Sequence, residues 1–234
     1  MRLGFIGENE PALVEADAKF AAEHGFEGLE YNYWSMWESW KQLTPELASD
    51  RRRTLEKHGV RVSALGIWGW NHISPDPAAR EQAHAAVARG VELASAMGAE
   101  VLILGAGDIP KAPLEQKLDE FFRVFRPLLD RIAQAGLAPA FYAAHGSSFL
   151  DSIEVFERVW EKLPQVKVKL DPANWLHHGE DYLSVLRRHG DKIAHFHVKE
   201  HLYTEQHKLV SQPAAGMGDI AWGKCLAFLH EHNY

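Results

Sequence analysis

The stretch VKVKLDPANWLHH (residues 166–178), followed by IAHFHVKE (residues 193–200), decides the fold that we predict for this chain. Each of its two short apolar segments leads into side chains of the kinds that hold ions or substrates: Asp171, Asn174, His195 and His197. A strand that ends in a carboxylate or an imidazole is typical of a site built on a parallel sheet. We therefore expect a functional site at the carboxyl ends of these two strands.

The rest of the chain repeats the same unit of strand followed by helix. Apolar segments predict seven strands, at residues 1–7, 26–32, 60–66, 100–105, 137–144, 166–170 and 193–198. Strict alternation of this kind indicates a parallel sheet, either closed as a TIM barrel or open and doubly wound. No GxGxxG motif follows the first strand, and the repeat is about 30 residues long, so we predict a TIM (β/α)8 barrel.

The chain ends at Tyr234, where such a barrel would begin its eighth strand. We therefore expect a barrel that lacks the eighth strand or is truncated there. A length of 234 residues suits one barrel, and no linker or low-complexity segment interrupts it. The sequence thus predicts a single domain over residues 1–234.

Composition and charge argue against several kinds of partner. The net charge of −7 is spread along the chain, whereas nucleic-acid binding needs a basic surface. No apolar run reaches the roughly 20 residues that span a bilayer, and the N-terminus shows no signal peptide. The one cysteine, Cys225, suits a reducing compartment. We expect a cytoplasmic protein that binds neither nucleic acid nor membrane.

Residues at the carboxyl ends of the predicted strands would line the mouth of the barrel. They are Glu8, Glu30, Asn32, residues 68–72, residues 105–108, His145, Asp171, Asn174, His197 and Glu200. Carboxylates and imidazoles from adjacent strands suit a divalent ion. Such an ion polarises a carbonyl and stabilises an enediolate while a carboxylate transfers the proton.

Six motifs follow one another over nearly the whole chain. They are GFEGLE (25–30), DPAAREQ (76–82), ASAMGAEVLILGAG (94–107), LDPAN (170–174), HFHVKE (195–200) and GMGDIAW (216–222). In this order and spacing they resemble the xylose isomerase-like TIM barrel superfamily of sugar phosphate isomerases and epimerases. The resemblance is specific for the superfamily and not for one substrate.

The resemblance implies one divalent ion (Mn, Zn, Mg or Co) held by residues from strands five to eight. Asp171 matches the ligand of strand six, and His197 matches the ligand of strand seven. Ala143 stands where strand five usually carries a glutamate or a histidine. We expect His145, two residues on and on the same strand face, to replace it as a ligand and catalytic group. Glu30 is expected to supply a catalytic carboxylate.

The residues expected to bind substrate are Asn174, Lys199, Glu200, Trp68, Trp70 and His72. Several of the site residues also have structural alternatives. Asp171 would otherwise cap a helix or form a turn, and His195 is more typical of a packed strand residue. Lys199 and Glu200 suit an ion pair, and the tryptophans suit packing or a subunit contact.

The favoured function is a metal-dependent sugar or sugar-phosphate isomerase or epimerase that transfers a proton next to a carbonyl. One alternative is a dehydratase or lyase of a cyclic polyol ketone. Another is a catalytically impaired sugar-binding relative, because Ala143 weakens the case for an enzyme. A DNA-repair endonuclease shares the fold but needs a richer His/Glu cluster and a basic face. We expect a small-molecule carbohydrate as the partner, and a homodimer through the aromatic loop at residues 33–40.

Overall fold

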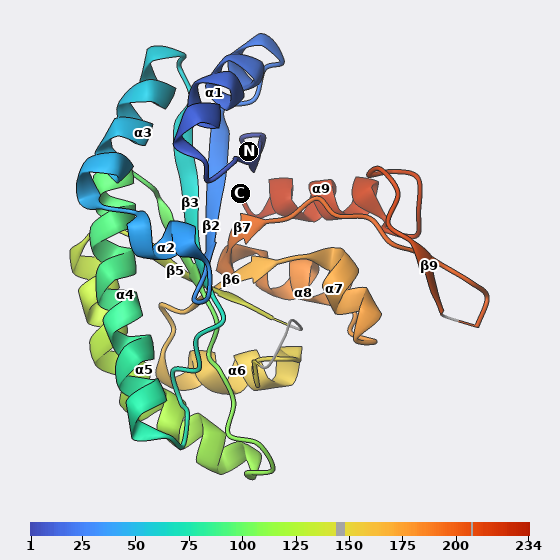
Figure 1. The fold of residues 1–234 in the computed structure, drawn as a ribbon. Helices are drawn as coiled ribbons and strands as arrows, with labels where there is room; N and C mark the ends of the chain where they lie inside the picture. Colours follow the sequence, from blue (N-terminus) through green and yellow to red (C-terminus); the bar gives the residue numbers. More distant parts are fainter. Residues whose placement is uncertain (144–147, 207) are drawn as a thin grey trace. The chain divides into compact units, whose positions relative to one another are not determined.

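The computed structural model describes residues 1–143, 148–206 and 208–234 (Figure 1). The chain divides into two compact units. The N-terminal unit is Arg2–Pro139, and the C-terminal unit is Ala140–Tyr234 together with Met1. The single domain predicted from the sequence stays a prediction.

Seven parallel strands follow one another in chain order, as a TIM barrel requires. They are β1 (Gly4–Ile6), β2 (Gly28–Trp34), β3 (Arg61–Trp68), β4 (Val101–Leu104), β5 (Ala138–Tyr142), β6 (Lys167–Leu170) and β7 (Ile193–Phe196). Pairing is parallel from β1 to β4 and from β5 to β7. This topology confirms the predicted fold class.

The predicted lack of an eighth strand is also confirmed within the described ranges. After β7 come only β8 (Leu202–Tyr203) and β9 (Leu209–Ser211), which pair with each other in a separate antiparallel hairpin. The sequence analysis predicted no strand in this region and missed the hairpin.

Helices alternate with the strands. They are η1 (Pro11–Leu13), α1 (Val14–Glu23), α2 (Glu38–Gln42), α3 (Pro45–Lys57), α4 (Pro77–Met97), α5 (Leu114–Gln134), α6 (Ile153–Lys162), α7 (Pro172–His177), α8 (Tyr182–His189), η2 (Gly190–Lys192) and α9 (Trp222–Glu231). The short helices α2 and α7 were not predicted. Of the helices that the structure describes, none is long and apolar enough to cross a membrane.

Strand β2 divides its side chains between two faces of the N-terminal unit. Figure 1 shows α3 and α4 on one side of β2 and β3. The side chains of Tyr31 and Tyr33 face α3, because the guanidinium of its Arg51 lies over both rings. The guanidinium of Arg51, on α3, lies 4.7 Å from the ring centre of Tyr31. Because successive side chains of a strand alternate, Glu30 and Asn32 project from the opposite face of the sheet.

The core of the C-terminal unit fixes α7 beside the end of β6. Trp175 of α7 is fully buried and stacks on Phe156 of α6, with ring centres 6.3 Å apart. The indole of Trp160, also on α6, donates to the carbonyl of Val166 at 3.0 Å. These contacts anchor α7 through its fourth residue, and so its first turn lies directly after β6.

His72 is a buried base inside the N-terminal unit. Its side chain is fully buried, with its ring edge-on to Phe125 and ring centres 5.4 Å apart. Neither ring nitrogen has a hydrogen-bond partner among the described residues. Burial, and to a lesser extent the charge of nearby His84, lowers the pKa of His72 to about 3. The folded protein therefore keeps this imidazole neutral.

We expect His72 to make the fold sensitive to mild acid. The unfolded chain takes up a proton at this histidine near pH 6.5, whereas the folded chain does so only near its pKa of about 3. The stabilisation is therefore complete above that unfolded value and is lost as the pH falls, by about 1.4 kcal/mol per unit. Urea unfolding of the wild type and of His72→Leu between neutral and acidic pH measures the difference.

The His72→Leu variant is expected to show a shallower decline of unfolding free energy with acid. His24→Leu, at an exposed histidine of the same unit, is the matched control and should keep the wild-type slope. Equal slopes for wild type and His72→Leu would contradict the assignment.

Candidate functional site

Four ionisable side chains lie on one face at the carboxyl ends of β6 and β7, within the C-terminal unit. They are Lys169, Asp171, His195 and His197. Lys169 pairs with His195 in the parallel register. The N–H of His197 donates to the carbonyl of Leu170 at 2.9 Å, which continues the pairing by one step. Side chains two residues apart on a strand share a face. Asp171 therefore projects from the same face as His197, as the sequence predicted for neighbouring ligands.

Asp171 has two different surroundings for its two oxygens. It is 3% exposed, and its Oδ1 accepts the N–H of Asn174 at 3.2 Å, which caps α7. Its Oδ2 lies 3.5 Å from Nζ of Lys169, which is also 3% exposed. The helix cap that the sequence left open as an alternative is thus present. Any cation at Asp171 has to compete with the Lys169 ammonium.

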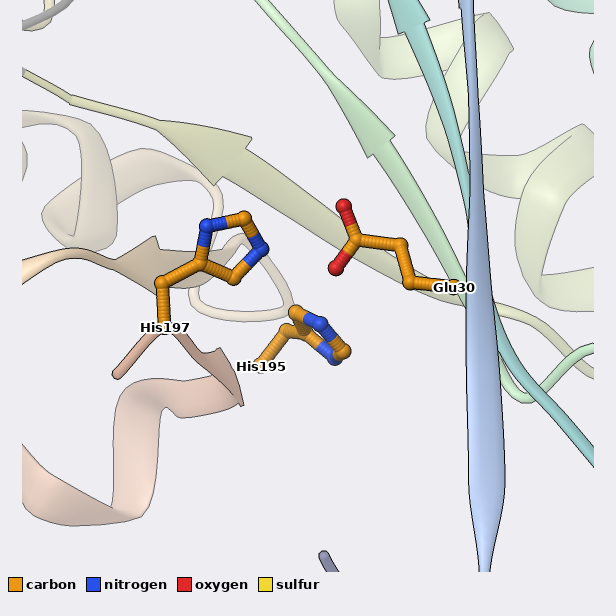
Figure 2. A group of neighbouring side chains, drawn as sticks. All are labelled: Glu30, His195 and His197. Atoms are coloured by element: carbon orange, nitrogen blue, oxygen red, sulfur yellow. The ribbon is translucent and has the colours of Figure 1, made fainter. Parts of the chain in front are cut away.

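His195 and His197 form a pair of imidazoles on β7 and the residue that follows it. Their ring centres are 5.4 Å apart, and each offers a ring nitrogen within 4.8 Å of the other (Figure 2). Imidazole nitrogens together with a carboxylate suit Zn, Mn or Co better than Mg, which prefers oxygen. His195 was interpreted from the sequence as a structural residue. It is a candidate ligand that the His-x-His spacing could have identified.

Asn174 and Lys199, which the sequence predicted to bind substrate, lie next to each other. Nζ of Lys199 donates to Oδ1 of Asn174 at 3.1 Å. Asn174 lies in the first turn of α7, and its backbone N–H is bound to Asp171. An amide and an ammonium therefore stand together at the first turn of the helix that Asp171 caps, and both groups can bind hydroxyl or carbonyl oxygens.

Glu200 holds a loop of its own unit. It is 2% exposed, and each carboxylate oxygen accepts two hydrogen bonds. Oε1 accepts the N–H groups of His201 and Ile220, both at 3.1 Å. Oε2 accepts the N–H of Gly216 at 3.0 Å and the indole N–H of Trp222 at 2.6 Å. These four donors give Glu200 a structural role, and we do not include it among the proposed substrate contacts.

Glu30 belongs to a hydrogen-bonded chain in the N-terminal unit. The amide of Asn32 donates to Oε1 of Glu30 at 2.6 Å, and the indole N–H of Trp68 donates to Oδ1 of Asn32 at 2.6 Å. Glu30 is 3% exposed, and Figure 2 draws its side chain on β2. A Cβ at Gly66 would lie 2.1 Å from Oδ1 of Asn32, so glycine is needed there for this chain to form.

The remaining residues predicted to bind substrate are largely packed. Trp68 stacks on Trp34 with ring centres 5.8 Å apart, and Trp70 lies edge-on to Trp40 at 6.5 Å. Packing, which the sequence left open for the tryptophans, is therefore present at both. His72 has no exposed surface to offer a ligand. We leave Trp70 and His72 out of the proposed site.

The strand-five position is described only in part. Ala143 directly follows β5 and is 2% exposed, and its methyl group has no donor for a metal ion. His145, predicted as a ligand and catalytic group, lies outside the described residues.

Comparison with known proteins identifies a family. A family model described as "Xylose isomerase-like TIM barrel" matches residues 18–234. Among curated proteins, no relative matches the chain.

Many solved structures share the fold. The probable 3-DHS dehydratase AsbF from Bacillus anthracis has a TM-score of 0.77 at 14% identity, covering 100% of this chain and 90% of that one. D-allulose 3-epimerase from Methylomonas sp., in complex with D-allulose, has a TM-score of 0.76 at 16% identity, covering 100% and 81%. IOLI protein with a binding zinc atom has a TM-score of 0.77 at 17% identity, covering 99% and 85%. At these identities the likeness shows the fold alone.

Proposed function

We propose that this chain, which belongs to the xylose isomerase-like TIM barrel family, is a metal-dependent isomerase or epimerase of a small carbohydrate. The reaction is the transfer of a proton next to a carbonyl. One observation carries the proposal. Asp171 and His197 stand at the carboxyl ends of two paired parallel strands, the place where TIM-barrel enzymes build their active sites.

The residues of the C-terminal unit fit a divalent ion. Asp171 and His197 would hold it, with His195 as a third donor from the same face. His145 stays a proposed further ligand. The bound ion supplies polarisation of the substrate carbonyl oxygen. Mn, Zn, Mg or Co suits the general reaction, and the imidazole pair favours Zn, Mn or Co.

The remaining steps are proposed for the chain's own side chains. Lys199 and Asn174 hold the substrate oxygens, because their ammonium and amide stand together at the first turn of the helix that Asp171 caps. Glu30 takes and returns the proton. Its carboxylate is held in orientation by Asn32, which is itself held by Trp68, and fixed geometry is the first requirement of a general base. Trp68 is thus proposed to act on substrate through Glu30, by positioning its carboxylate.

Two other functions remain as outcomes of the test. A dehydratase would use the same ion and proton transfer to expel water, and a structural neighbour is described as a probable dehydratase. A sugar-binding relative without turnover is favoured by Ala143, whose methyl group removes one family ligand.

Exchange of substrate hydrogen with solvent tests the proposal. A panel of ketoses is incubated with the ion-loaded protein in deuterium oxide and followed by proton NMR. Incorporation of deuterium next to the carbonyl, with formation of an isomer, supports the isomerase or epimerase. Loss of water from a cyclic polyol ketone supports the dehydratase. Ketose binding seen by line broadening, without either reaction, supports the binding protein.

Lys169→Met is expected to tighten the binding of a divalent ion. The Lys169 ammonium lies 3.5 Å from Oδ2 of Asp171 and repels any cation at that oxygen. Removing a unit charge a few ångströms from the ion is worth about 1.4 kcal/mol or more, which is roughly tenfold in Kd. Isothermal titration with Zn²⁺ or Mn²⁺ measures the change.

The matched control is Lys167→Met, two residues earlier on β6. Its Nζ donates to the backbone carbonyl of Asp191 at 2.8 Å, and it forms no salt bridge with any residue that the structure describes. The control should bind the ion as the wild type does. Weaker or unchanged binding by Lys169→Met would show that Lys169 does not compete at Asp171.

Two predictions about the whole protein also stay proposals. The proposed dimer contact would use Met36 and Trp37, which are 77% and 42% exposed, because Trp40 is buried. A cytoplasmic location remains the expectation from the single cysteine.

A further inference from the structure

A buried histidine stands next to the proposed site with one ring nitrogen unused. His201 is 2% exposed, and its Nδ1 lies 2.9 Å from Oη of Tyr203. Its Nε2 is buried and has no hydrogen-bond partner among the residues that the structure describes. A buried polar atom without a partner is uncommon and marks a place for a ligand or a water.

Tyr203 connects this histidine to the surface of the same unit. Oη of Tyr203 lies 3.3 Å from Nδ1 of His177, and the His177 side chain is exposed. The rings of His177 and Tyr203 stack with centres 6.3 Å apart. The three side chains therefore form a hydrogen-bonded line from solvent to the buried Nε2 of His201.

Tyr203 has one hydroxyl proton for two histidine nitrogens. When it donates to His177, it accepts from Nδ1–H of His201, and Nε2 of His201 is then an acceptor. When it donates to Nδ1 of His201, it accepts from Nδ1–H of His177, and Nε2 of His201 then carries the proton. Reversing the hydroxyl together with the tautomers of both histidines thus changes the buried nitrogen from acceptor to donor without any net charge.

The loop that carries His201 is held rigidly. Glu200 accepts the backbone N–H of His201 at 3.1 Å, and the backbone N–H of Asp219 donates to the His201 carbonyl at 2.9 Å. The side chain of Asp219 accepts the N–H of Tyr203 at 2.7 Å. A Cβ at Gly218 would lie 2.4 Å from the His201 carbonyl, so this close approach needs glycine. The backbone is therefore held in place at both His201 and Tyr203.

The pKa of His201 responds to charged residues of the proposed site. Burial lowers the pKa of His201, and the Lys199 ammonium and His177 lower it further, while the Asp171 carboxylate acts in the opposite direction. The lowered pKa favours the neutral imidazole. Contacts place His201 near the proposed site: Lys199, two residues before it, donates to Asn174 of α7 at 3.1 Å, and the ring centre of His177, also on α7, lies 5.9 Å from that of His201.

We propose that Nε2 of His201 binds a hydroxyl of the carbohydrate held at Asp171 and exchanges the hydroxyl proton with solvent through Tyr203 and His177. The proton leaves the substrate through four transfers. The substrate oxygen keeps its electron pair and gives its proton to Nε2, Nδ1–H passes to Tyr203, the tyrosine proton passes to Nδ1 of His177, and Nε2–H of His177 passes to water. The proposal rests on the proposed function for its ligand and not for the proton line.

Hydrogen exchange at the His201 ring tests the line without any substrate. In nitrogen-15 NMR of the full chain, exchange of the His201 ring proton with water is expected to slow by about tenfold or more in Tyr203→Phe and in His177→Asn. His178→Asn, at the neighbouring exposed histidine, is the matched control and should exchange as the wild type does. Unchanged exchange in Tyr203→Phe would overturn the line.

A second arm tests the ligand contact with D-allulose as the probe. With the ion-loaded wild type, D-allulose is expected to shift the Nε2 resonance of His201. His201→Asn is expected to weaken D-allulose binding about tenfold while leaving the Kd of Zn²⁺ unchanged. An unshifted Nε2 resonance overturns the contact for ketohexoses. If the wild type does not bind Zn²⁺, the proposed function fails instead. The measurement of ring-proton exchange would then still test the proton line through Tyr203 and His177.

Discussion

Replacement of Asp171 by asparagine is expected to weaken divalent-ion binding about a hundredfold or more. The substitution removes the only negative charge among the four ionisable side chains that share the face of β6 and β7. Asparagine still caps α7, because its side-chain oxygen can accept the N–H of residue 174 as Oδ1 of Asp171 does at 3.2 Å. Isothermal titration of Zn²⁺ and Mn²⁺ measures the loss, and circular dichroism checks that the fold is retained.

Asp181→Asn is the matched control for Asp171→Asn. Asp181 caps α8, with Oδ1 accepting the N–H groups of Leu183 and Ser184 at 3.1 and 3.0 Å. It is a helix-capping aspartate of the same unit, and its replacement should leave ion binding unchanged. The double variant Lys169→Met/Asp171→Asn removes the charge competition as well and should still fail to bind. Ion binding by this double variant at wild-type strength would contradict the role of Asp171.

Replacement of Glu200 by glutamine is expected to lower the free energy of unfolding by about 3–5 kcal/mol. The buried carboxylate accepts four hydrogen bonds, from His201, Gly216, Ile220 and Trp222. Glutamine offers one oxygen and turns an NH₂ group toward two of these donors. For a chain of this length the loss corresponds to a Tm lower by about 10 °C. Thermal unfolding followed by circular dichroism gives the shift.

The same carboxylate makes the protein sensitive to strong acid. Burial alone would raise the pKa of Glu200, but the hydrogen bonds led by the Trp222 indole lower it below its ordinary value. The stabilisation is therefore present above the ordinary pKa of a glutamate and is lost as the pH falls through the lowered value. Glu200→Gln should lack this acid-dependent loss. Glu205→Gln, at an exposed glutamate of the same unit, should behave as the wild type. A Glu200→Gln variant as stable as that control would contradict the structural role of the four hydrogen bonds that Glu200 accepts.

Local signals were enough to predict the strands and the first pair of site residues. The segments before Asp171 and His197 are short, apolar and bounded by turn residues. A hydrophobic pattern and turn residues of this kind depend only on residues that are neighbours in the sequence. Parallel alternation then implies that adjacent strands end at the same edge, which is why Asp171 and His197 could be expected together.

The residues that the sequence did not reveal depend on register. Lys169 enters the site because it pairs with His195 across β6 and β7, after a shift in register between Val168 and Lys169. A shift of this kind has no signature in a single sequence. The His-x-His spacing indicated His195 as a possible ligand. We gave more weight to the general tendency of histidines in strands to be packed, and so interpreted His195 as structural.

Long-range hydrogen bonds account for the other difference. Glu200 was expected to touch substrate, but it binds donors 16 to 22 residues further along the chain. The motif GMGDIAW contains three of these donors, and the contacts of these three residues with Glu200 are structural. Such pairings arise from loop closure, which composition and periodicity do not encode.

Anomalous diffraction from crystals of this chain soaked with Zn²⁺ tests the central claim most directly. The account predicts one strong anomalous peak about 2.0–2.3 Å from a carboxylate oxygen of Asp171 and from a ring nitrogen of His197. The absence of a peak there, with the Lys169 ammonium still next to Asp171, would contradict it.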